Sequence, residues 1–122
     1  MRETTNFTEV QWNCRCEYCR REVPHEMNAH VMEKVQLIRE DANRPLVLNS
    51  AYRCRRHPEE ARKASPGRHN QGLAVDIRVN SDRERMEIVD LGLKHGARGI
   101  GVANSFVHLD WREDPKTMWL YS

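Results

Sequence analysis

The sequence lacks a long hydrophobic run: no stretch reaches the roughly 18 apolar residues that a membrane-spanning helix needs. The first residues, Met1–Asn6, also lack the apolar core of a secretory signal. Neither sign of charge is in excess, because 20 basic residues face 18 acidic ones, whereas a nucleic-acid-binding domain of this size usually carries an uneven basic surface. These absences predict a protein that binds neither membrane nor nucleic acid and that stays in the cytoplasm of the producing cell until it is released or delivered elsewhere.

Repeats, low-complexity tracts and long linkers are absent too. A length of 122 residues suffices for one domain and not for two. We therefore expect residues 1–122 to form a single domain, in which residues 1–24 are an irregular, cysteine-containing segment. Nothing in the sequence indicates an oligomer, and we expect a monomer.

The spacing of apolar residues predicts two helices and four strands in the rest of the chain. The second helix begins with a Ser-x-x-Glu capping pattern and is expected to bury Met86, Val89 and Leu93. The expected elements are a helix over residues 26–39, strands over 46–48 and 72–79, a helix over 81–94, and strands over 99–102 and 105–111, with a helical turn near 58–64. This order predicts a small α+β domain with an antiparallel sheet and helices packed on one face.

Four cysteines form an uneven pattern, with Cys14, Cys16 and Cys19 in a C-x-C-x-x-C cluster and Cys54 alone. Three interpretations of these cysteines remain open: a metal site, which would be separate from the candidate site described below, disulfide bonds, and plain reduced thiols. A four-cysteine zinc site usually has two C-x-x-C halves, and here the second half is a single residue. The absence of a secretion signal disfavours disulfides in the producing cell.

Three side chains could meet around a metal ion. Asp76 lies on the polar face of the strand at 72–79, and His108 lies on the polar face of the last strand. If these strands are neighbours, the two Cβ atoms lie roughly 5 Å apart, and His69 can fold back from the preceding loop. Two imidazoles and one carboxylate suit Zn²⁺ and leave the fourth tetrahedral position open, as in catalytic zinc sites.

Two further residues could act beside such a metal. Asp110 lies on the same face as His108 but about 7 Å along the strand, so it is placed to accept a proton or to orient a ligand histidine. Arg53 follows the strand at 46–48 and could hold a substrate carboxylate or stabilise a developing oxyanion.

Three blocks of sequence together resemble the zinc D-Ala-D-Ala carboxypeptidases and their phage-endolysin relatives, which include L-alanyl-D-glutamate endopeptidases. The blocks are SAYR at Ser50–Arg53, HNQGLAVDI at His69–Ile77 and FVHLD at Phe106–Asp110. The resemblance runs from about Asn13 to the end of the chain. It implies the fold that this family shares with the hedgehog signalling domain.

The resemblance also implies a function. It assigns Zn²⁺ to His69, Asp76 and His108 and places Arg53 against the substrate. Several relatives carry the catalytic carboxylate at the position of Ser105, so we expect Asp110 to act as the base or to support it. The implied activity is hydrolysis of an amide bond in peptidoglycan stem peptides by a zinc-activated water, at the cell wall after lysis or delivery. The alternatives are a non-catalytic zinc-containing binding module of the same fold and a cysteine–zinc interaction domain.

Overall fold

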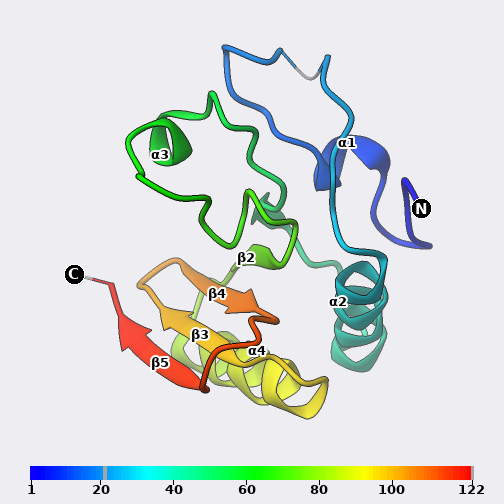
Figure 1. The fold of residues 1–122 in the computed structure, drawn as a ribbon. Helices are drawn as coiled ribbons and strands as arrows, with labels where there is room; N and C mark the ends of the chain where they lie inside the picture. Colours follow the sequence, from blue (N-terminus) through cyan, green and yellow to red (C-terminus); the bar gives the residue numbers. More distant parts are fainter. Residues whose placement is uncertain (21, 122) are drawn as a thin grey trace.

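The structure is a computed structural model that describes residues 1–20 and 22–121. A five-stranded sheet with strand order β1-β2-β4-β3-β5 organises these residues (Figure 1). Along the chain the elements are α1 (Glu9–Trp12), α2 (Ala29–Ala42), β1 (Leu48–Ser50), α3 (Pro58–Ala61), β2 (Ala74–Arg78), α4 (Asp82–Lys94), β3 (Gly99–Val102), β4 (Phe106–Asp110) and β5 (Thr117–Leu120). Within the described residues, no helix is long and apolar enough to cross a bilayer.

The sheet is antiparallel from β1 through β2 and β4 to β3, as predicted, but β5 pairs parallel to β3. The predicted α+β class is therefore confirmed with a mixed sheet in place of a fully antiparallel one. Strand β5 is not among the strands predicted from the sequence. Both edges of β4 are already paired, with β2 and with β3, so the returning chain adds to the free edge of β3 and runs parallel to it.

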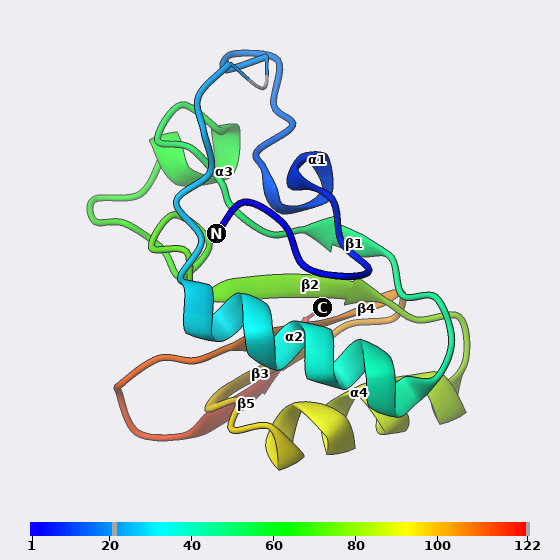
Figure 2. The same cartoon turned by 90° about the vertical axis from the view of Figure 1, so that its right-hand side faces the viewer.

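Helices α2 and α4 pack side by side on one face of the sheet (Figure 2). Alternation along the strands supplies the apolar surface that they cover, because Val75 and Ile77 of β2 and Val107 and Leu109 of β4 are completely buried. The opposite face of the same strands carries the polar residues. The sheet thus separates a hydrophobic core from a polar face.

Helix α4 packs differently from the prediction. Met86 and Leu93 are 67% and 47% exposed, and the buried residues of the helix are Ile88 and Gly92. Of the predicted apolar face, Val89 packs against the core but Met86 and Leu93 do not. The reason is that α4 approaches β4 closely through Gly92: a Cβ at this position would lie 2.6 Å from Cδ2 of Leu109. Close backbone approach, rather than the largest apolar side chains, sets the orientation of the helix.

Other boundaries move by a few residues. Helix α2 begins after Asn28, whose side chain accepts a hydrogen bond from the Val31 N–H, and it ends at Asn43 in a left-handed conformation. Strand β1 lies two residues later than predicted. The amino-terminal segment, expected to be irregular, contains the short helix α1, which buries Trp12.

We predict that Gly92→Ala destabilises the fold. An ordinary glycine-to-alanine change in a helix gains up to about 1 kcal/mol, but overpacking a core costs about 1–3 kcal/mol, and the Leu109 side chain that the new methyl group would meet is fully buried. Denaturant unfolding should show a net loss of about 1 kcal/mol. Met86→Ala on the exposed side of α4 should stay within about 0.5 kcal/mol of the wild type. A Gly92→Ala protein more stable than the wild type would refute this packing.

Candidate metal centre

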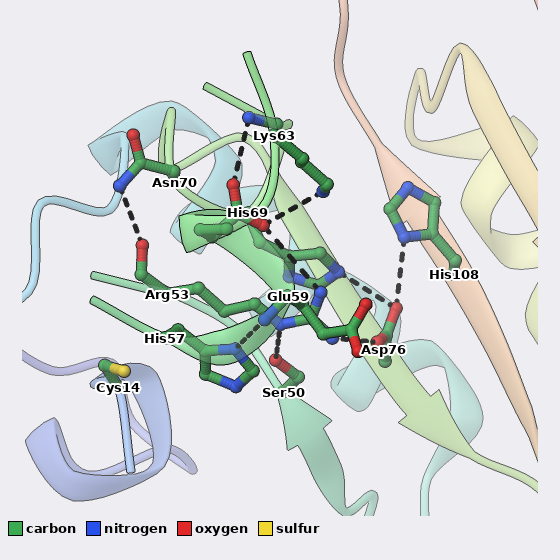
Figure 3. A network of polar contacts seen from close by, with 12 residues as sticks. Cys14, Ser50, Arg53, His57, Glu59, Lys63, His69, Asn70, Asp76 and His108 are labelled. Atoms are coloured by element: carbon green, nitrogen blue, oxygen red, sulfur yellow. Dashed lines mark hydrogen bonds and ion pairs between the residues drawn. The ribbon is translucent and has the colours of Figure 1, made fainter. Parts of the chain in front are cut away.

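The polar face of the sheet brings the candidate ligands together by strand register. Asp76 of β2 lies directly opposite His108 of β4 in the antiparallel ladder. His69 lies in the turn that leads into β2, and Figure 3 shows its ring beside the Asp76 carboxylate. The three residues are 4–7% exposed. The structure therefore brings together His69, Asp76 and His108, which were selected from the sequence.

The backbone after β1 holds the His69 turn in place. The His69 Nδ1–H donates to the carbonyl oxygen of Ala51 over 2.7 Å. The Arg53 N–H donates to the carbonyl oxygen of His69, and the Asn70 side chain donates back to the carbonyl oxygen of Arg53 over 2.9 Å (Figure 3). The main chain of the SAYR block thus holds His69 in place.

Gly72 closes the same turn in a way that no other residue could. Its φ is +75°, in the region that favours glycine. A Cβ there would lie 2.1 Å from the carbonyl oxygen of Glu26, while the Gly72 carbonyl accepts from the Asn28 N–H. The glycine between the first two candidate ligands therefore lets the turn dock against the start of α2.

The three ligand atoms converge on one point. His69 Nε2 lies 3.2 Å and His108 Nδ1 lies 3.0 Å from Oδ1 of Asp76. One ligand atom from each of the three residues lies within 4.8 Å of the other two. This arrangement brings two imidazole nitrogens onto a single carboxylate oxygen.

The outer hydrogen bonds of the two rings decide what these inner atoms can do. His69 Nδ1 must carry a proton, because the Ala51 carbonyl can only accept. His108 Nε2 lies 2.7 Å from Oδ2 of Asp110 and likewise donates. In the neutral rings the inner nitrogens therefore hold lone pairs, and both face an oxygen that also holds lone pairs. Such a cluster needs positive charge at its centre, and a divalent cation fits this donor set.

The raised pKa of His108 agrees with a need for positive charge at this place. Burial disfavours the charged ring, but hydrogen bonds to Asp110 and Asp76 outweigh burial and raise the pKa of His108. Burial also opposes the charge on Asp76, yet hydrogen bonds from the two histidines hold its pKa well below the usual value. The surroundings thus favour positive charge on or beside His108 and an ionised Asp76 carboxylate.

Asp110 supports His108 and does not face the pocket. Its side chain is completely buried, and Arg112 donates to both of its oxygens over 2.8 Å. Burial alone would raise the pKa of Asp110, but the bonds from Arg112 and His108 hold it well below its usual range. A buried, doubly bonded carboxylate of low pKa is a poor proton acceptor. Of the two roles predicted for Asp110, the geometry favours orienting His108 and disfavours general base.

Arg53 occupies the wall of the site. Its Nη2 lies 3.3 Å from Oδ2 of Asp76, the oxygen that the histidines leave free, and its Nε donates to the Ser50 hydroxyl over 3.0 Å (Figure 3). Its side chain is 18% exposed. Arg53 therefore fixes the Asp76 carboxylate while part of its guanidinium still reaches the pocket.

Glycines on the neighbouring strand make room for this arrangement. Gly99 lies opposite Asp110 and Gly101 lies opposite His108 in the β3–β4 ladder. A Cβ at Gly99 would lie 2.3 Å from Oδ1 of Asp110, and one at Gly101 would lie 2.7 Å from Nε1 of Trp119. A strand without side chains on this face lets Asp110 and Trp119 lie across it.

A pocket of about 840 Å³ opens over the three candidate ligands. Residues that the sequence analysis did not single out line much of it. Among them are Glu59, Lys63, Arg68, Arg112, Trp119 and Tyr121. The alternation of side chains along a strand could have indicated three of these residues. Arg112 continues the face of His108 and Asp110, and Trp119 of β5 and Tyr121 just after it, two residues apart, share a face.

The four cysteines lie together in a second place, away from this pocket. Each of Cys14, Cys16, Cys19 and Cys54 offers a sulfur within 4.8 Å of the other three. All four are free thiols. The Cys54 sulfur lies 3.6 Å from that of Cys14 and 3.5 Å from that of Cys16, whereas a disulfide requires about 2.05 Å.

We predict that Asp110→Ala weakens metal binding at the centre by about 10–100-fold, the range typical for loss of a residue that orients a ligand histidine. The cause is the loss of the acceptor for His108 Nε2–H. Competition with a chromophoric chelator measures the affinity. Asp114→Ala, which removes an exposed acidic partner of Arg68, should match the wild type. An unchanged affinity in Asp110→Ala would show that the carboxylate does not orient the ring.

Comparison with known families agrees with the geometry of this centre. The model of the peptidase M15 family matches residues 5–110. This range contains the three candidate ligands His69, Asp76 and His108, together with Arg53 and Asp110. A comparison with curated proteins found no match. Members of the matched family are zinc peptidases, and the matched range covers most of the sequence. The resemblance drawn from the three sequence blocks is thereby confirmed, and the chain belongs to the peptidase M15 family.

Proposed function

We propose that this protein is a zinc metallopeptidase that hydrolyses an amide bond in peptidoglycan stem peptides. The observation that carries the proposal is the convergence of two imidazole nitrogens and a carboxylate oxygen at the floor of an open pocket. Three protein ligands leave a position for solvent and substrate, which distinguishes catalytic zinc sites from structural ones.

His69, Asp76 and His108 would hold the zinc ion. When bound, zinc supplies a Lewis acid that polarises a carbonyl group and lowers the pKa of a water molecule toward neutrality. Asp110 accepts from His108 Nε2 and so leaves the Nδ1 lone pair of that ring facing inward. The carbonyl oxygen of Ala51 accepts from His69 Nδ1 and so leaves the Nε2 lone pair of that ring facing inward. These outer contacts fix the ligand atoms before the ion arrives.

Basic side chains around the pocket support a substrate that carries carboxylates. Arg53, Lys63, Arg68 and Arg112 line it, and they outnumber the acidic lining residues. Peptidoglycan stem peptides carry free carboxylates. Arginine binds a carboxylate through two parallel hydrogen bonds, and the 18% exposed Arg53 beside Asp76 is placed to bind a substrate carboxylate or the developing oxyanion.

Glu59 is our candidate for the group that accepts a proton from the attacking water. Among the described residues that line the pocket, Glu59 and Asp76 are the only carboxylates, and Asp76 is committed to the histidines and Arg53. The Glu59 side chain is 47% exposed and pairs with the exposed Arg62, so it can change rotamer in the pocket that it lines. The same group would then return the proton to the leaving amine.

A non-catalytic zinc-containing binding module is the second candidate. Its support is Ser105, which stands where several relatives carry a catalytic carboxylate, together with the burial of Asp110 behind His108. One measurement distinguishes the two candidates, because only a peptidase creates new free amino groups.

We predict that the zinc-loaded protein cleaves muropeptides and that His108→Ala abolishes the cleavage. Liquid chromatography with mass spectrometry identifies the bond: release of D-alanine means a carboxypeptidase, and separation of L-alanine from D-glutamate means an endopeptidase. His30→Ala, which removes an exposed histidine of α2, is the matched control and should cleave like the wild type. Intact muropeptides after prolonged digestion with zinc-loaded wild type would favour the binding module.

We predict that Glu59→Gln lowers kcat about 10²–10⁴-fold, the usual contribution of a general base, without changing the zinc content. Glu33→Gln, which alters an exposed glutamate on α2, should leave kcat unchanged. Steady-state kinetics on a defined muropeptide and metal analysis of the same preparations provide both values. A kcat for Glu59→Gln equal to that of the wild type would exclude Glu59 as the proton acceptor.

A further inference from the structure

The second cysteine group is built from two distant parts of the chain. Cys14, Cys16 and Cys19 follow α1, and Cys54 is the residue directly after the SAYR block. Three of the four side chains are 1–5% exposed, and Cys16 is half-buried. Folding thus collects all the cysteines of the sequence at one place, where the amino-terminal segment meets the connection between β1 and α3.

The spacing of the sulfurs matches a tetrahedral metal site. Zinc–sulfur bonds of about 2.3 Å at tetrahedral angles separate neighbouring sulfurs by about 3.8 Å. The sulfur of Cys54 lies 3.6 Å from that of Cys14 and 3.5 Å from that of Cys16. A pair of disulfides would draw the sulfurs together two by two, whereas here each of the four lies within 4.8 Å of the other three.

The local backbone also has the form of a metal-binding turn. Residues Cys16–Cys19 form a C-x-x-C turn in which the Cys19 N–H donates to the Cys16 sulfur over 3.4 Å. Arg56 donates to the carbonyl oxygen of Tyr18 over 2.8 Å and fastens this turn to the segment that carries Cys54. A backbone N–H directed at sulfur stabilises a thiolate.

The charge of the surroundings suits an anionic cluster. Four thiolates around a divalent cation carry two net negative charges, which are costly to bury without compensation. In sequence, the positions next to the four cysteines are rich in arginine. These neighbours are the exposed Arg15, Arg20 and Arg55, against the single acidic neighbour Glu17, while the side chain of the adjacent Arg53 turns to Asp76.

We propose that Cys14, Cys16, Cys19 and Cys54 bind a second zinc ion, a structural one that is separate from the zinc of the histidine centre. The closed donor set, with four protein ligands, fits a structural rather than a catalytic site. Its ion fastens the amino-terminal segment to the residue that follows Arg53, and so holds the wall of the main pocket. The site does not depend on the proposed peptidase activity.

The test counts zinc in the full chain, purified with zinc under reducing conditions and then dialysed. Elemental analysis should find two zinc ions per wild-type chain, one in Cys16→Ser and one in His108→Ala. Glu17→Ser, an exposed neighbour inside the C-x-x-C turn, is the matched control and should retain two. Cobalt in place of zinc should give a thiolate-to-metal charge-transfer band in the wild type and in His108→Ala.

A second measurement covers the case in which Cys16→Ser does not fold. A thiol-specific mercurial, added to folded His108→Ala, should release its remaining zinc into a chromophoric indicator. The proposal is overturned if His108→Ala holds no zinc, if Cys16→Ser holds as much as the wild type, if the unreduced mass shows disulfides, or if the cysteines hold iron instead. Loss of the histidine zinc alone would count against the proposed function and leave this site standing.

Discussion

The structure depends on one electrostatic constraint: an imidazole nitrogen of His69 and one of His108 face the same oxygen of Asp76, and with both rings neutral their lone pairs repel. Each ring is fixed from outside, His69 by a main-chain carbonyl and His108 by a buried carboxylate. The protein therefore cannot relieve the repulsion by turning a ring without breaking a buried hydrogen bond. A cation relieves it, and the pocket above the ligands leaves that cation accessible from one side.

Much of the fold can be understood as support for these three side chains. The antiparallel pairing of β2 with β4 fixes the distance between Asp76 and His108. Two glycines on β3 leave space behind His108 for Asp110 and Trp119, and helices α2 and α4 seal the opposite face of the sheet. Arg53 connects the main pocket with the cysteine cluster, because its side chain binds Asp76 and the next residue is Cys54.

Period-two alternation indicated the faces of the strands on which the central residues of the site lie, and the three sequence blocks supplied the ligand assignment. Alternation placed Asp76 and His108 on the polar faces of two strands, and the structure shows that these strands are neighbours in the register that brings the two residues together. The role of Asp110 could not be resolved in the same way, since alternation places the residue on the correct face but does not reveal that Arg112 neutralises it. The orientation of α4 was missed because it depends on the contact between Gly92 and Leu109. Strand β5 was missed because the choice between two sheet edges is a tertiary effect.

The cysteines illustrate a limit of the same kind. Spacing along the chain left a metal, a disulfide and free thiols open, and only the meeting of Cys54 with the amino-terminal cluster favours the metal. For the histidine centre, the most direct measurement is anomalous scattering at the zinc edge from crystals of the zinc-loaded protein. The account predicts a peak in contact with His69 Nε2, Asp76 and His108 Nδ1. A density map with these three side chains fully ordered and no peak among them would contradict it.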